Sequence, residues 1–189
     1  QQMFGGAATD EVSKQFAKAM ADTNISAIVF DIDSPGGQVA GIPQLADQIF
    51  EARGKGKQII AQCDGTLASA AYYIASQCDK VFASHSTDDI GSIGTVCCFY
   101  DYSKAFEKEG VEAVVTASGP MKGLGIHGAP ITEDQRSYLK EKIDQSTSEF
   151  LAAVQRGRGL SPDAVKSVAT GGTVRAGEAI TQGLIDGVQ

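Results

Sequence analysis

The stretch SAIVFDIDSPGG, residues 26–37, decides how this chain folds. Its first half, residues 27–32, is almost continuously apolar, which is typical of a strand buried on both faces of a parallel sheet. Its last four residues, SPGG at 34–37, are residue types that end strands and form turns. The stretch therefore predicts a buried strand that stops abruptly in a loop.

Helical and strand-like patterns alternate along the chain after this stretch, and one helix precedes it. Helices are expected at residues 9–20, 39–52, 67–78 and 102–110, and further strands at residues 58–64, 80–84, 94–101 and 111–118. Such alternation predicts βαβ units with right-handed crossovers. A long helix at 132–156, a short one from Ser161 and a final turn follow. We expect one α/β domain over residues 1–189 with a mostly parallel sheet, its βαβ core and site within 1–130 and a helical region at 131–189.

Composition excludes several classes of partner. The 189 residues carry a net charge of −7, which argues against nucleic acid or an anionic membrane surface as the main partner. No apolar run approaches the length of a membrane span. The four cysteines, at 63, 78, 97 and 98, show no metal-binding spacing and are expected to be buried free thiols.

The SPGG turn is the first candidate for a site, because loops at the carboxyl ends of parallel strands are where sites are built. Gly36 and Gly37 let the backbone approach a ligand closely and present N–H groups, which could hold a developing oxyanion. A tight turn without chemistry is the alternative.

Ser69 is the second candidate, in GTLASAAYYIASQCD at residues 65–79. It lies where a strand is expected to pass into a helix, so it is either a nucleophile or a small residue that lets the helix pack closely. A serine nucleophile needs a base. His85 and His127 lie in polar or glycine-rich loops without a carboxylate at a diagnostic spacing, so a Ser-His-Asp triad stays open but nothing selects it.

Lys122 offers another base, as the only charge in the GPMKGLG loop at residues 119–125. Removing a lysine from water favours its neutral amine, which can take a proton. A solvated loop lysine is the alternative. Ser92, in GSIG at residues 91–94, could exchange a hydrogen bond with such an amine or could simply form a turn.

Four segments in order resemble the signal peptide peptidase A family of serine proteases, which use a Ser-Lys dyad and share the crotonase and Clp-protease superfold. They are IDSPGG at 32–37, ASAAYYIA at 68–75, GSIG at 91–94 and GPMKG at 119–123, and GEAITQGLIDGV at 177–188 resembles the family's closing segment. The resemblance covers nearly the whole chain.

The resemblance implies a role for each candidate residue. Ser69 would be the nucleophile, Lys122 the general base and Ser92 the hydroxyl that orients the lysine. The backbone N–H groups of Gly36 or Gly37 and of Ala70 would form the oxyanion hole. The implied activity is a serine endopeptidase that works through an acyl-enzyme and requires neither a metal nor an organic cofactor.

The resemblance also suggests a biological setting. Alanines at positions 70 and 71, where many members have glycines, are a version associated with phage-encoded relatives. The chain is therefore identified as similar to a phage head-maturation protease that cuts capsid or scaffold proteins in the host cytoplasm, with cleaved signal peptides as alternative substrates. The alternative to the cytoplasm is a location at the membrane, as part of a longer, membrane-associated protein. The family forms rings, which implies a homo-oligomer.

Two other functions stay open. A crotonase-like coenzyme A-dependent hydratase or isomerase would share the fold, but it would want an acidic residue at the site, and none replaces Ser69. A catalytically inactive capsid-associated scaffold component would keep the fold without the chemistry, although the presence of both Ser69 and Lys122 argues against it.

Overall fold

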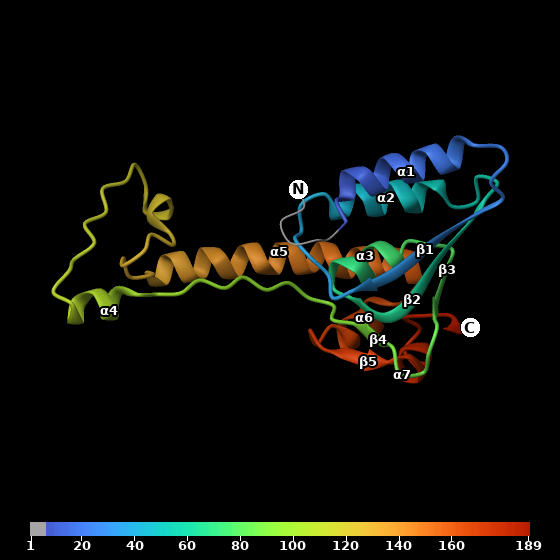
Figure 1. Cartoon of the computed structure of the whole chain (residues 1–189). Helices are drawn as coiled ribbons and strands as arrows, with labels where there is room; N and C mark the ends of the chain where they lie inside the picture. Colours follow the sequence, from blue (N-terminus) through green and yellow to red (C-terminus); the bar gives the residue numbers. More distant parts are fainter. Residues whose placement is uncertain (1–6) are drawn as a thin grey trace. The chain divides into compact units, whose positions relative to one another are not determined.

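The computed structural model describes residues 7–189 of the chain (Figure 1). These residues form two compact units: the first comprises the described residues up to Gly94 together with Thr147–Gln189, and the second comprises Thr95–Ser146. Helix α5 (Glu133–Arg158) begins in the second unit, and its residues from Thr147 onward belong to the first. The expectation of one domain with a boundary near residue 130 stays a prediction.

A mostly parallel sheet forms the centre of the first unit. Its strands are β1 (Ala27–Ser34), β2 (Gln58–Ala68), β3 (Lys80–Ala83), β4 (Asp89–Gly91), β5 (Thr173–Arg175) and β6 (Gly187–Val188). The central strand β2 pairs in parallel with β1, β3 and β4, and β6 pairs in parallel with β3. β5 runs antiparallel to β4. The predicted α/β class with a mostly parallel sheet is confirmed.

Helices pack against this sheet through apolar faces. α1 (Thr9–Ala21), α2 (Ile42–Ala52) and α3 (Ala70–Ala75) pack together beside β1 and β2 (Figure 1), while α7 (Ala176–Thr181) contacts β4, β5 and β6. α6 (Pro162–Val168) begins at Ser161, whose hydroxyl accepts a hydrogen bond from the Ala164 N–H. None of the helices that the structure describes combines the length and the apolar character that crossing a membrane requires.

Strand β1 differs from the prediction of a strand buried on both faces. Its side chains alternate between exposed and half-buried, and Val29 is 58% exposed. β1 pairs with β2 and with no other strand of the described residues, so it is an edge strand. Phe30, on the covered side, stacks on Phe16 of α1. A continuous apolar run cannot by itself distinguish a strand covered on one face from a strand covered on both.

The second unit has little regular structure. It contains α4 (Ser103–Lys108), the 3₁₀ helix η1 (Pro120–Gly123) and the first part of α5. The strands expected at 94–101 and 111–118 are absent: both segments are irregular and largely exposed. A β-rich composition produces a strand only where a partner satisfies the backbone hydrogen bonds.

The four cysteines also differ between the two units. Cys63 and Cys78 are buried, as expected, and burial raises the pKa of both thiols to about 12, so they are poor nucleophiles. Cys97 and Cys98 are exposed, which corrects the expectation that all four are buried. They lie in the segment that was expected to be a strand.

Candidate active site

Three parallel strands end side by side in the first unit. Ser34 of β1 pairs with Leu67 of β2, and Ala68 of β2 pairs with Gly91 of β4. Because the strands are parallel, their carboxyl ends lie at one edge of the sheet, where sites form in α/β folds. The SPGG turn, Ser69 and Ser92 follow these three strands directly and therefore meet at this edge.

Ser69 has a strained backbone. It lies between β2 and α3 with φ 52° and ψ −123°, and its N–H donates to the Gly91 carbonyl at 2.8 Å. A residue with a side chain in such a conformation costs about 1–3 kcal/mol, so the surrounding contacts must hold it there. Among the described residues, Ser69 and Ser92 are the only non-glycine residues with a positive φ. Strain of this kind concentrates at functional positions.

The SPGG turn lies directly against the Ser69 side chain. Gly36 has φ 112°, and a Cβ placed on it would lie 2.6 Å from Cβ of Ser69 and 3.0 Å from its Oγ. Only glycine fits this close approach. The Gly36 N–H donates to the Ser34 hydroxyl at 3.2 Å, whereas a Cβ on Gly37 would meet nothing within 4 Å. Of the two glycine N–H groups predicted as oxyanion donors, that of Gly36 is thus already engaged in a hydrogen bond.

Ser92 is fixed by the loop that precedes β5. Its N–H donates to the Gly172 carbonyl at 2.7 Å, and its hydroxyl donates to the Gly171 carbonyl at 3.1 Å. A hydroxyl that donates its hydrogen in this way still has oxygen lone pairs that can accept from an amine. Sequence reasoning missed the part played by Gly171 and Gly172, although two consecutive glycines indicated a close backbone approach.

Lys122 belongs to the second unit. It lies on η1, where its N–H donates to the Gly119 carbonyl at 3.1 Å, and its side chain is exposed. In this structure the lysine is thus solvated, which is the alternative that the sequence left open, and its role as a base stays a prediction. The structure brings Ser69, Ser92 and Gly36 together in the first unit and places Lys122 in the other.

Neither histidine forms the arrangement of a triad. His85 is exposed, and its Nε2 lies 3.8 Å from the equally exposed Oδ1 of Asp64. Asp64 precedes Ser69 by five residues of extended strand, which corresponds to roughly 16 Å. His127 lies in the second unit, where it packs against Tyr102 and Phe106. These positions give no support to a Ser-His-Asp triad.

A cavity of about 500 Å³ lies beside the SPGG turn in the first unit, and both glycines of the turn line it. Apolar side chains of three elements form much of its wall: Phe30 and Ile32 of β1, Ile42 and Leu45 of α2, and Ala70 and Ile74 of α3. A cavity of this size and character can receive an apolar side chain of a ligand next to Ser69.

Comparison with known proteins finds similarity to peptidases. Residues 51–189 match the family described as Peptidase family S49. The chain is 35% identical over 148 residues to the head-tail preconnector protein GP5 of Enterobacteria phage P21. These residues are 78% of this chain and 29% of the relative.

Two further relatives resemble the chain over most of its length. Capsid assembly protease C of Escherichia phage lambda is 33% identical over 170 residues, which is 89% of this chain and 38% of the relative. Protease 4 of Haemophilus influenzae is 25% identical over 177 residues, which is 94% of this chain and 28% of the relative. The matched residues therefore span about a third of the length of each of these three relatives.

Proposed function

The chain belongs to peptidase family S49, and from this premise we propose that it is a serine endopeptidase whose nucleophile is Ser69 and whose general base is Lys122. Ser92 accepts a hydrogen bond from the lysine amine and orients it. The backbone N–H groups of Gly37 and Ala70 hold the oxyanion, and Gly36 leaves room for the nucleophile.

The proposed reaction is an acyl transfer in two steps. The neutral amine of Lys122 takes the proton of the Ser69 hydroxyl while its oxygen attacks the carbonyl carbon of a peptide bond. The carbonyl oxygen becomes negatively charged and is stabilised by the two backbone N–H groups. The C–N bond then breaks, Lys122 returns the proton to the leaving amine, and water hydrolyses the ester on Ser69.

The observation that carries this proposal is the strained backbone of Ser69 against Gly36. A serine that only allowed a helix to pack closely would have no reason to adopt a positive φ, nor to lie where a side chain on the facing residue would overlap it. The Ala70 N–H supports the same proposal, because the first N–H groups of a helix have no partner within the helix.

For the substrate, we propose an extended segment of a phage head protein, cut after an apolar or small residue. The apolar cavity beside the SPGG turn supports the side-chain preference. The names of two relatives, a capsid assembly protease and a head-tail preconnector protein, support the class of substrate and a place of action in the host cytoplasm. Digestion of a peptide library by wild-type protein and by Ser69→Ala would give the preference directly.

We propose further that the chain acts as a homo-oligomer. The two segments at 94–101 and 111–118 have β-rich sequences but form no strands, and Val96 and Val114 are 89% and 83% exposed. Strand pairing with a second copy would satisfy the backbone groups and cover these side chains. Light scattering on the purified chain should give a multiple of the mass of one copy.

The two rival functions make different predictions. Membership of a peptidase family gives a coenzyme A-dependent hydratase no support. An inactive scaffold component would keep the fold but would not react at Ser69. A variant that lacks the Lys122 amine distinguishes a Ser-Lys protease from both rival functions, because neither rival depends on Lys122.

Covalent labelling with a serine-directed fluorophosphonate tests the proposal. Intact mass and peptide mapping between pH 6 and 10 should show one label on Ser69, with a rate that rises with pH as the base loses its proton. Lys122→Ala should lower the rate by at least about 10³-fold, the order seen when a member of a catalytic unit is removed. Absence of label on the assembled oligomer at every pH would favour the inactive scaffold.

A further inference from the structure

Gln135 is the only buried side chain of the second unit. It is 6% exposed, and every other side chain of the described residues 95–146 is exposed or half-buried. A buried amide destabilises a protein unless its donor and acceptor groups are hydrogen-bonded. The partners of this amide therefore show which parts of the unit it holds together.

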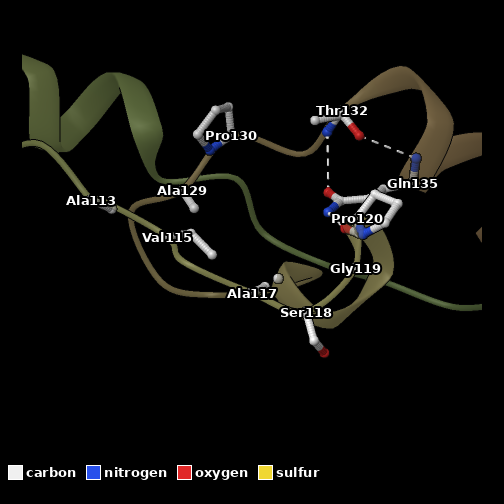
Figure 2. A pocket seen from close by; sticks show the side chains of 11 residues that line it. Ala113, Val115, Ala117, Ser118, Gly119, Pro120, Ala129, Pro130, Thr132 and Gln135 are labelled. Atoms are coloured by element: carbon white, nitrogen blue, oxygen red, sulfur yellow. Dashed lines mark hydrogen bonds between the residues drawn. The ribbon is translucent and has the colours of Figure 1, made fainter.

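One half of the Gln135 side chain closes the start of α5. Its Oε1 accepts from the Thr132 N–H at 3.2 Å, and the Gln135 N–H donates to the Thr132 hydroxyl at 3.2 Å. Figure 2 marks both bonds. This reciprocal pair is a capping box, which the spacing of Thr132 and Gln135 in the sequence could have predicted.

The other half of the side chain reaches the turn that carries Lys122. Nε2 of Gln135 donates to the Pro120 carbonyl at 2.8 Å, and Pro120 is the first residue of η1. Figure 2 shows Pro120 beside the Gln135 side chain. One amide thus joins the lysine-bearing turn to the first turn of a 26-residue helix.

The turn itself has few other restraints. Its internal bonds run from the Lys122 N–H to the Gly119 carbonyl at 3.1 Å and from the Leu124 N–H to the Met121 carbonyl at 3.3 Å. Such 3₁₀ bonds have poor geometry and are used only in short pieces. An open cavity of about 490 Å³ borders the turn at Gly119, Pro120 and Gly123, and Val115 approaches it at Gly123, where an added Cβ would lie 3.0 Å from Cγ1 of Val115.

We propose that Gln135 is a positioning residue for Lys122: its bond to the Pro120 carbonyl fixes the turn from which the lysine reaches its partner. The inference rests on the proposed function, in which Lys122 is the base. A misplacement of about 1 Å can lower a rate about 10²-fold, so a single bond at this point has a measurable effect.

The variant Gln135→Glu tests the bond selectively. The carboxylate keeps the acceptor for the Thr132 N–H, so the capping box survives, but it has no donor for the Pro120 carbonyl. We expect the rate of Ser69 labelling, and kcat on a peptide substrate, to fall about tenfold with little change in KM. Gln145→Glu is the matched control, because Gln145 lies exposed on the same helix and its amide bonds only to the side chains of Glu141 and Lys142, one turn away.

A double variant shows whether the effect passes through the lysine. If Gln135 acts by placing Lys122, then Gln135→Glu should cause no further loss of labelling rate in a Lys122→Ala background. An equal loss in both backgrounds would mean that Gln135 supports the fold in general, and this would overturn the inference.

Hydrogen exchange keeps this inference separate from the proposed function. In Gln135→Glu the amides of Lys122 and Leu124 should exchange about tenfold faster than in the wild type, whether or not the protein is active. Unchanged exchange overturns the positioning role. Wild-type labelling that does not depend on Lys122 would instead contradict the proposed function and leave this structural result intact.

Discussion

In the first unit the sheet and its helices bury a continuous apolar core, whereas in the second unit no apolar side chain of the described residues is buried. The proposed nucleophile lies in the first and the proposed base in the second. The strained Ser69 needs a rigid support, because packed surroundings must offset the cost of its backbone. The lysine turn buries none of its residues, and the bond from Gln135 to the Pro120 carbonyl ties it to α5.

Truncating an apolar side chain in each unit should give the largest difference between the units, measured as the loss of free energy of unfolding. Leu67 of β2 is fully buried, so Leu67→Ala should lower the free energy of unfolding by about 2–5 kcal/mol. Val114 is 83% exposed, so Val114→Ala should change it by less than about 0.5 kcal/mol. Urea denaturation monitored by circular dichroism measures both.

A larger loss of stability in Val114→Ala would indicate whether the exposed side chains of the second unit are covered in solution. If the loss exceeds about 1 kcal/mol and grows with protein concentration, another copy covers Val114 in solution. Equal losses for Leu67→Ala and Val114→Ala at every concentration would contradict the contrast between the two units.

Alanine substitutions at two glycines distinguish the effect of backbone strain from the effect of overlap with a neighbouring side chain. Gly36 and Gly110 both have a positive φ, but a Cβ on Gly36 would overlap Ser69, while a Cβ on Gly110 would meet nothing within 4 Å. Gly36→Ala should therefore lower the rate of Ser69 labelling by at least about tenfold and destabilise the protein by about 1–3 kcal/mol. Gly110→Ala should cost only about 1 kcal/mol, from the backbone alone. Equal labelling of the two variants would argue against a site at Gly36.

Acid should produce the smallest effect, and it should appear in the second unit. The Ser103 hydroxyl and the N–H groups of Ser103 and Ile131 donate to the Asp101 carboxylate and hold its pKa at about 2. Because the pKa is lower in the folded state, the stabilisation is complete above the unfolded value of about 3.9 and is lost as the pH falls through about 2.

Comparison with Asp101→Asn measures this contribution. The variant should be slightly less stable than the wild type at pH 6, and the difference should shrink below about pH 4 and vanish near pH 2. Thermal unfolding followed across this range would show it. A difference that stays constant with pH would mean that the charge of Asp101 contributes nothing.

Much of the first unit could be predicted because its patterns are local. The helices at residues 9–20 and 39–52 and the strands at 58–64 and 80–84 correspond to α1, α2, β2 and β3 with shifts of a few residues at their ends. The short strands β4 and β5 were missed, because three-residue strands depend on their partners and carry no periodicity of their own. They matter, since they fix the backbone around Ser92.

The second unit could not be predicted in the same way. Residues 94–101 and 111–118 have the composition of strands, but composition cannot supply a neighbouring strand. The exposure of Cys97 and Cys98 has the same origin. A residue predicted to be buried by an expected strand is exposed when that strand does not form.

The sequence by itself determined the fold class, the family and the candidate residues, because periodicity and ordered motifs are properties of consecutive residues. Only the tertiary structure decided that Ser69 is strained, that Gly36 touches it, and that the Gly36 N–H is already bonded to Ser34. It also decided that Gln135 holds the turn of Lys122. These features depend on contacts between residues far apart in the chain, and such contacts are set by packing and strand register.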